Sequence, residues 1–238
     1  GYAAGNPAAA FTAARLLPSD DRTQRDLRRE ALEEIIEAQI ENGGLAAARL
    51  QVEQLEDGPL KADLMREMVD EWASFDPEGA AAYVESLGDA ATPNMQTALL
   101  SEWAENDPAA AAAWLSGREA NEEILGRASA AIIRQWTRYD LAASAEWLNS
   151  MPDSPELDRA VMSYTYRAAE EDPASAMTWA ESINNDWMRT RMMERVASTW
   201  QEDDPEGFQV YLDQADLTEE QRAALQDPEN FHRGRGWR

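Results

Sequence analysis

Apolar residues recur at helical spacing along most of this chain. After Asp107 the sequence reads Pro-Ala-Ala-Ala-Ala-Ala-Trp-Leu, with Ala111, Trp114 and Leu115 at the fourth, seventh and eighth positions after the Asp. These positions lie on one face of an α-helix. The pattern therefore predicts a short amphipathic helix that begins at Asp107-Pro108.

The same helix start recurs along the chain at a nearly constant interval. An Asp, usually followed by Pro, stands seven residues before an aromatic residue in five pairs: Asp76 and Tyr83, Asp107 and Trp114, Asp140 and Trp147, Asp172 and Trp179, Asp204 and Tyr211. Successive Asp residues are 31, 33, 32 and 32 residues apart. A fixed period of this size is typical of stacked helical repeats.

Each Asp is predicted to cap the first helix of a repeat, because its carboxylate can accept from free amides of the first turn and Pro suits the first helical position. Small residues at the fourth position, namely Ala80, Ala111, Ser144 and Ala176, let a neighbouring helix approach closely, whereas Phe208 breaks this rule. The aromatic residue one turn later is expected to fill the space between repeats.

A second helix is predicted in every repeat, with caps at Thr92-Pro93, Asn121, Ser154-Pro155, Asn185, and Thr218 with Gln221. A Trp stands four residues before the next capping Asp at four of the five repeat corners: Trp72, Trp103, Trp136 and Trp200. Ala168 takes that place in one repeat, with Tyr164 and Tyr166 as substitutes nearby. These aromatic residues are expected to pack where one repeat turns into the next.

Towards the amino end the pattern is weaker. Asn42-Gly43-Gly44 and Asn6-Pro7 resemble the same helix start, and Asp26 to Ile40 reads as a long amphipathic helix. The sequence therefore predicts an all-α fold, a right-handed α-solenoid of about seven helix-turn-helix repeats with a period near 32 residues. Its expected parts are a divergent capping repeat (1–41), the repeat array (42–226) and an irregular basic tail (227–238).

The helix start resembles one known family. Asp107-Pro108-x-x-Ala111-x-Ala113-Trp114 and Asp172-Pro173-x-x-Ala176-x-x-Trp179 look like the opening of a tetratricopeptide repeat, and the likeness extends over residues 42 to 215. The family's period of about 34 residues and its Leu-Gly-Tyr element are not reproduced, and Trp replaces a small residue at four of five repeat corners. The chain is thus similar to a divergent, tetratricopeptide-like solenoid.

Charge and composition restrict the partners. The 238 residues carry 46 acidic and 21 basic side chains, a formal net charge of -25, which disfavours nucleic acid and anionic membrane surfaces. The chain has no Cys, and its apolar runs are too short to cross a membrane. It begins at Gly1 without Met, which suits a fragment or a processed chain, and we favour a periplasmic or otherwise exported location.

Candidate chemistry is sparse. His232 is the single histidine and lies in the tail, Gly43-Gly44 lacks the spacing of a nucleotide-binding loop, and carboxylate pairs such as Glu170 with Asp172 coincide with a predicted cap. Most Trp and Met residues follow the repeat register and are expected to be core residues, whereas Trp187 and Trp237 fall outside it. No catalytic residue, cofactor or metal site is predicted, and we expect a non-catalytic chain.

Function is expected to follow from shape. Helical solenoids present an extended surface to a partner peptide, and in the similar family the first helices line it. That resemblance implies partner contacts at Glu85, Met177, Glu181, Gln209 and Asp213, to which the off-register Trp187 is added. The sequence favours an adaptor with an acidic groove for a basic protein or peptide. Two alternatives stay open: a structural subunit of a larger, envelope-associated complex, and a helical accessory domain of an enzyme whose catalytic part lies elsewhere.

Overall fold

The computed structural model describes residues 6–118 and 121–226. These residues form α-helices joined by turns and two short 3-10 segments, with no strand among them, so the predicted all-α class is confirmed. The helices divide into two compact units, the first ending at Asp107 and the second beginning at Pro108. Each unit is described by itself.

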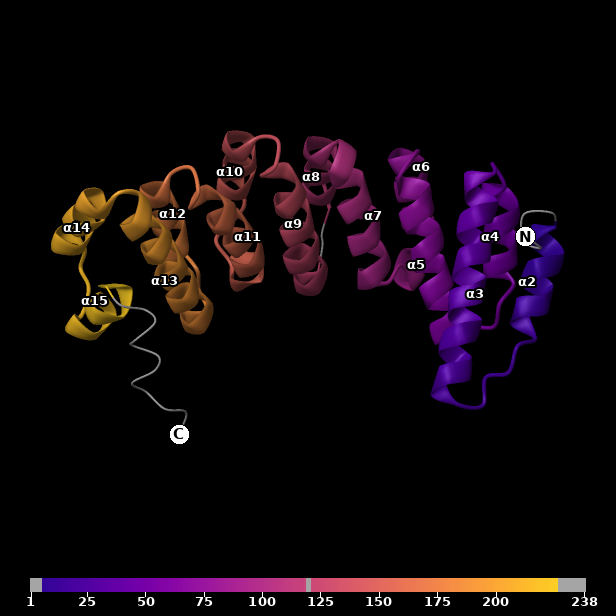
Figure 1. Ribbon diagram of the computed structural model, residues 1–238. Coiled ribbons are helices and arrows are strands. Elements are labelled where there is room, and N and C mark those ends of the chain that lie inside the picture. Colours follow the sequence, from indigo (N-terminus) through magenta and orange to yellow (C-terminus); the bar gives the residue numbers. More distant parts are fainter. Residues whose placement is uncertain (1–5, 119–120, 227–238) are drawn as a thin grey trace. The chain divides into compact units, whose positions relative to one another are not determined.

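The described residues of the first unit form six helices: α2 (Pro7–Arg15), α3 (Arg22–Glu41), α4 (Leu45–Glu53), α5 (Pro59–Ala73), α6 (Pro77–Ser86) and α7 (Pro93–Asn106). Helices α3, α5 and α7 lie side by side (Figure 1). Helix α2 packs against α3, α4 against α3 and α5, and α6 against α5 and α7. The long helix expected at Asp26 to Ile40 is present as α3.

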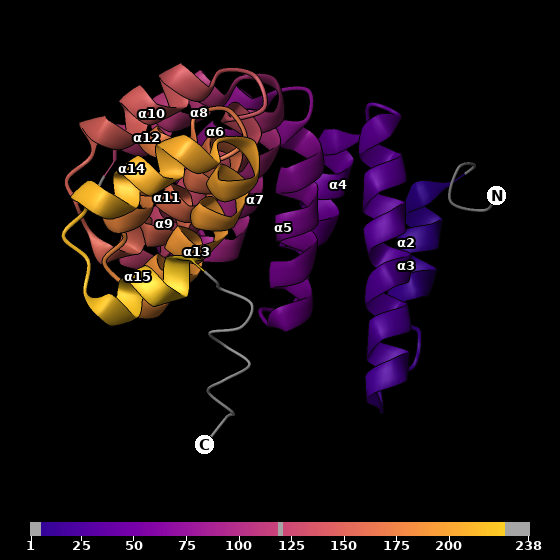
Figure 2. The same cartoon turned by 60° about the vertical axis from the view of Figure 1, so that its left-hand side comes forward.

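In the part of the second unit that the structure describes there are eight helices: α8 (Pro108–Ser116), α9 (Glu122–Trp136), α10 (Leu141–Ser150), α11 (Asp158–Ala168), α12 (Pro173–Glu181), α13 (Asp186–Asp203), α14 (Pro205–Gln214) and α15 (Glu219–Gln226). Helices α9, α11 and α13 lie side by side, and α10 and α12 each pack against two of them. Figure 2 shows α10, α12 and α14 as a second layer above α9, α11 and α13.

The Asp residues of the repeat cap helices as predicted. The backbone amide three residues on donates to Asp76 (3.1 Å), Asp140 (2.9 Å), Asp172 (3.0 Å) and Asp204 (3.0 Å). Asn6 caps α2 in the same way, and Thr218 and Gln221 form a reciprocal capping box before α15. These bonds satisfy amides that would otherwise lack a partner at the helix start.

The aromatic residues pack across the repeat corners. Ring centroids are 5.6 Å apart for Trp72 and Tyr83 and 6.0 Å apart for Trp136 and Trp147. Where Ala168 takes the corner position, Tyr164 lies 4.7 Å from the Trp179 ring and replaces the missing Trp. The small residues at the fourth position are all buried, as close approach of the neighbouring helix requires.

The aromatic residue at the seventh position also makes a bond to the preceding repeat. The Trp147 indole donates to Ser116 Oγ at 3.0 Å, and the Tyr211 hydroxyl donates to Glu181 Oε1 at 2.7 Å. Both acceptors lie nine residues after the preceding capping Asp. Burial and the neighbouring Glu53 carboxylate raise the pKa of Tyr83 to about 12, and Glu53 lies nine residues after Gly44, the N-cap of α4.

One predicted helix start differs from the structure, and a second is present but has no side-chain cap. Ser154-Pro155 opens a 3-10 turn, Pro155–Leu157, and α11 begins only at Asp158, so the cap predicted at Ser154 is wrong. Pro155 still occupies the first position of this turn, as its fixed φ allows. Gly44 precedes α4 without a side-chain cap, because glycine has no acceptor to offer.

The basic tail, with His232 and Trp237, lies outside the described residues. Within the described part, none of the helices combines the length and the apolar character that a membrane span requires. The number of repeats and the solenoid arrangement remain predictions.

Candidate functional site

Three of the predicted contact residues are exposed and polar on α12 and α14. Glu181 accepts the Tyr211 hydroxyl bond, and Gln209 Nε2 donates to Asp213 Oδ1 at 2.8 Å. Burial, together with the Glu181 carboxylate, holds the pKa of Tyr211 above its usual range. Glu181 thus stabilises the contact between two repeats. This structural role explains why a hydrogen-bond acceptor stands at its position.

The remaining three predicted residues lie in different surroundings. Glu85 is exposed at the end of α6, in the first unit. Trp187 is 69% exposed in the first turn of α13. Met177 is only 1% exposed and belongs to the core of the second unit, so it is not part of a surface.

Met177 is buried because its repeat position faces a neighbouring helix. The equivalent residues, five after the capping Asp, include Ala81 and Ala112, which are also buried. Gln209 has the same position on α14 and is exposed. Met177 and Gln209 were both predicted to lie on one partner surface. Their shared repeat position is buried on α12 and exposed on α14, so Met177 belongs to the core.

A group of carboxylates in the first unit lies close enough together for their charges to raise pKa values within the group. Its members lie on the three adjacent helices α3, α5 and α7, and we call this surface the acidic face: Glu37, Glu41, Glu67, Asp70, Glu71, Glu102 and Glu105. Spacings of three and four residues place the members from each helix on one side of that helix.

These carboxylates disfavour one another's charge. Burial raises the pKa of Asp70, and the negative charges of Glu67 and Glu105 raise it further, while Arg66 opposes the rise. Arg66 Nη2 pairs with Glu67 at 2.7 Å. Burial likewise raises the pKa of Glu71 and of Glu102, with added repulsion from carboxylates on the neighbouring helices. A cationic group bound here would relieve that repulsion.

The second unit has an open groove of about 890 Å³ at the amino ends of α9, α11 and α13, lined in part by Glu122, Glu123, Glu156, Arg127, Arg159 and Met188. Arg127 pairs with Glu123 at 3.0 Å. Acidic and basic groups are thus mixed along the groove, which carries a weaker net charge than the acidic face.

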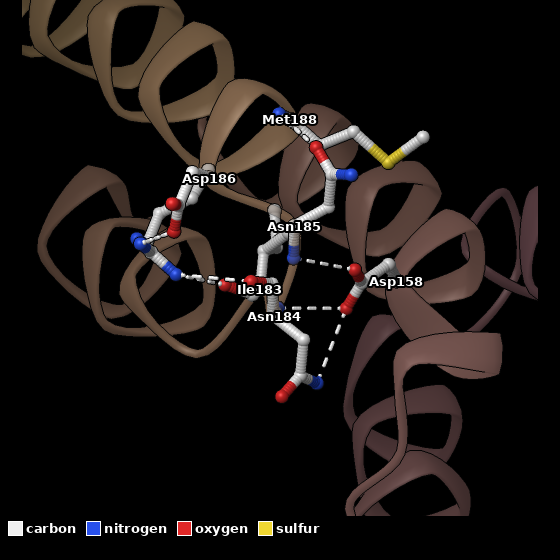
Figure 3. A network of polar contacts seen from close by, with 7 residues as sticks. Asp158, Ile183, Asn184, Asn185, Asp186 and Met188 are labelled. Atoms are coloured by element: carbon white, nitrogen blue, oxygen red, sulfur yellow. Dashed lines mark hydrogen bonds and ion pairs between the residues drawn. The ribbon is translucent and has the colours of Figure 1, made fainter.

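Asp158 is the buried carboxylate of this groove, and its oxygens hold the loop before α13 in place (Figure 3). Oδ1 accepts from the backbone amide of Asn184 at 2.8 Å and from its Nδ2 at 3.3 Å, while Oδ2 accepts from the backbone amide of Asn185 at 2.8 Å. Asp158 is 4% exposed. With three donors already bound, it is a structural group.

Asn185 and Arg189 complete the same network. The Asn185 side chain caps α13 by accepting from the Met188 amide at 3.0 Å (Figure 3). Arg189 donates to the Ile183 carbonyl at 2.7 Å and pairs with Asp186. These contacts give the loop 182–185 a defined conformation at the groove edge.

Among the described residues, no group of three or more His, Cys, Asp or Glu side chains converges well enough to hold a metal ion. The carboxylates of the acidic face are spread over three helices, so they suit an extended cationic ligand better than a single ion.

Sequence reasoning missed the acidic face, although a signal was present. Glu71 and Glu102 each directly precede a corner Trp, Trp72 or Trp103, and so occupy the same repeat position. This recurrence on the second helices is visible only when equivalent positions of different repeats are compared. Comparisons with protein-family models, with curated proteins and with solved structures found no match for the chain.

Proposed function

We propose that the chain is a non-catalytic protein-binding scaffold whose acidic face binds a basic polypeptide segment. The observation that carries this proposal is the acidic face, in which burial and the repulsion of neighbouring carboxylates raise the pKa values of Asp70, Glu71 and Glu102. Folding concentrates like charges at this surface at a cost in stability, and a cationic partner would offset that cost.

The spread of the carboxylates favours a polypeptide over a small cation. Packed helices lie about 8–10 Å apart, so three helices present a surface about 20 Å wide. An extended segment of about six residues spans that distance. Arg is the preferred basic residue for such a ligand, because its planar guanidinium pairs with carboxylates through two parallel bonds.

The proposal includes the architecture. Recurring caps, corner aromatic residues and bonds from the seventh position to the preceding repeat support a right-handed, tetratricopeptide-like α-solenoid of about seven repeats. Such arrays commonly bind extended peptides along a surface made by successive repeats. The net charge of -25 argues against nucleic acid as the partner.

The test is the affinity of a labelled peptide of about twelve residues with alternating Arg and Ser, measured by fluorescence anisotropy at low and moderate salt. We expect binding that weakens as salt rises. The triple variant Asp70→Asn, Glu71→Gln, Glu102→Gln should bind about tenfold more weakly, because three charge pairs are lost.

The matched control is the variant Glu122→Gln, Glu123→Gln, Glu156→Gln, which removes the same charge from the groove of the second unit. Its affinity for the peptide should change less than about twofold, because none of these residues belongs to the acidic face. Equal losses in both variants would show that only net charge matters, and failure of the wild-type chain to bind would refute the proposal.

A second function, a structural subunit of a larger assembly, is favoured by one observation. Trp187 is 69% exposed beside Met188, a residue that lines the groove of the second unit. Exposed aromatic residues of this kind are common at protein interfaces. Capture of a stoichiometric complex that survives moderate salt and is lost in Trp187→Ser would support this function over the acidic-face adaptor.

A further inference from the structure

A pocket of about 460 Å³ in the second unit has the opposite charge to the rest of the chain. It lies between α9, α11 and α13, and its walls include Arg134, Arg138, Arg167, Tyr166, Met162 and Met192. Among the described residues that line it, none is Asp or Glu. In a chain with more than twice as many acidic as basic residues, three Arg side chains around one pocket are a marked local reversal.

Two of these Arg side chains have charge available for a ligand. Arg134 and Arg138 are exposed, and neither makes a side-chain hydrogen bond or ion pair within the described part of the chain. Arg167 is partly neutralised by Glu170 and Glu171. The Arg195 guanidinium lies 4.9 Å from the centre of the Tyr166 ring and adds positive charge at the same edge.

The Arg residues of this pocket stand at repeat positions that have carboxylates of the acidic face in the first unit. Asp70 and Arg134 each lie six residues before the capping Asp that follows them. Glu71, Glu102 and Arg167 each lie five residues before the next capping Asp. Glu105 and Arg138 likewise share the position two residues before the cap, so equivalent parts of the second helices have opposite charge in the two units.

We propose that this basic pocket binds an acidic polypeptide segment in which carboxylates flank an apolar side chain. Arg134 and Arg138 would pair with the carboxylates. The apolar side chain would cover Met162, Met192 and the ring of Tyr166, which is 52% exposed. The site is separate from the acidic face and does not depend on the function proposed for it.

The helix ends argue against phosphate as the ligand. Arg134 and Arg167 lie in the last turns of α9 and α11, where the helix dipole is negative and free carbonyls disfavour a compact dianion. Carboxylates on an extended segment can meet the guanidinium groups at the pocket edge instead. Phosphate also offers nothing to the Met side chains.

A simple structural role explains only part of this arrangement. Arg134 and Arg167 interact favourably with the dipoles of the helices that they end. Arg138 lies beyond α9, and the apolar walls contribute nothing to that effect. Binding experiments separate the two roles. If the Arg side chains only stabilise the helix ends, the chain does not bind an acidic peptide, and replacing them changes stability alone.

The experiment uses the full chain and a fluorescein-labelled peptide of about twelve residues in which Glu-Glu pairs alternate with Leu or Phe. Arg134→Gln with Arg138→Gln should weaken binding about tenfold, as expected for two charge-assisted contacts. The control, Arg127→Gln with Arg159→Gln, makes the same charge change near the other ends of α9 and α11 and should alter affinity less than about twofold.

Three results of the peptide assay would overturn the proposal. These are no binding of the peptide to the wild-type chain, an equal loss in the control, and competition by inorganic phosphate as strong as that by unlabelled peptide. A fourth is concentration-dependent dimerisation that Arg134→Gln with Arg138→Gln abolishes, measured by light scattering, because it would assign the pocket to a second copy of this chain. Unchanged circular dichroism of both variants ensures that loss of binding is not loss of fold.

Discussion

At the scale of single residues, carboxylates in this chain have distinct roles that depend on the groups around them. Asp76 accepts from the Gly79 amide at the start of α6 and from the Trp72 indole at 3.1 Å, so one side chain caps a helix and orients the corner Trp. Asp158 holds a loop through three donors. Asp70, by contrast, is placed among other carboxylates.

Asp158→Asn should destabilise the second unit by about 1–3 kcal/mol, because one acceptor oxygen becomes a donor that faces a backbone amide in a buried site. Urea unfolding measures this change. Asp153→Asn is the control, since Asp153 is exposed and accepts one bond, from Asn184 Nδ2 at 3.1 Å. Equal effects of the two substitutions would contradict the role of Asp158.

The roles of residues that contact near neighbours in the chain could be predicted from the sequence. A capping Asp is recognisable because its bond partner is three residues away, and Tyr164 was recognisable as a substitute at a corner without Trp. Met177 was misplaced, since whether its position is covered depends on the packing of the neighbouring helix. The raised pKa values of the acidic face come from burial first and partly from carboxylates on neighbouring helices, so no single segment predicts them.

At the scale of elements, contacts between helices decide local geometry. The 3-10 turn Pro155–Leu157 packs against α9 so closely that a Cβ atom on Gly126 would lie 2.7 Å from the Glu156 carbonyl oxygen. The sequence predicted a helix start at Ser154 because Ser-Pro is a common one. It gave no sign that α9 would occupy the adjacent space.

Gly126→Ala should therefore destabilise the chain by about 1–3 kcal/mol, because the backbone of the 3-10 turn must move to accept the methyl group. Gly117→Ala serves as the control, since its Cβ would come no closer than 3.5 Å to its neighbours. Thermal unfolding monitored by circular dichroism compares them. Similar melting temperatures for the two variants would show that the turn adjusts freely.

The bond from Tyr211 to Glu181 links consecutive first helices. A double-mutant cycle with Tyr211→Phe and Glu181→Gln should give a coupling of about 0.5–1.5 kcal/mol, the usual net value for a hydrogen bond. Urea unfolding of the four proteins provides the numbers. Additive effects would mean that the bond contributes nothing to the contact between the repeats.

At the scale of the whole molecule, the distribution of charge matters more than the net value of -25. Like charges gather on the acidic face, whereas three Arg side chains surround the pocket between α9, α11 and α13. The sequence showed the charge excess and led to the expectation of a basic partner. It did not show which helices would present that charge.

The acidic face should make stability depend on pH. Because the pKa values of Asp70, Glu71 and Glu102 are raised in the folded state, that state binds more protons than the unfolded chain in mildly acidic solution. Their unfavourable contribution is absent below the ordinary carboxyl pKa, about 4, and grows as pH rises through the raised values.

The variant Asp70→Asn, Glu71→Gln, Glu102→Gln should therefore be more stable than the wild-type chain at neutral pH, by about 1 kcal/mol. The difference should shrink as pH falls. Replacing Glu122, Glu123 and Glu156 by Gln should instead lower stability, because Glu122 and Glu123 lie at the amino end of α9. Urea titrations over a pH series distinguish these results, and a destabilised acidic-face variant would contradict the account.

The central claim is that a basic segment binds at carboxylates whose pKa values are raised. Isothermal titration calorimetry at about pH 5, in two buffers of different ionisation enthalpy, measures the protons exchanged when the Arg-Ser peptide binds. We expect proton release by the wild-type chain, because the cationic ligand lowers those pKa values, and little release by the Asp70, Glu71 and Glu102 variant. Binding without proton release, or equal release by both proteins, would contradict it.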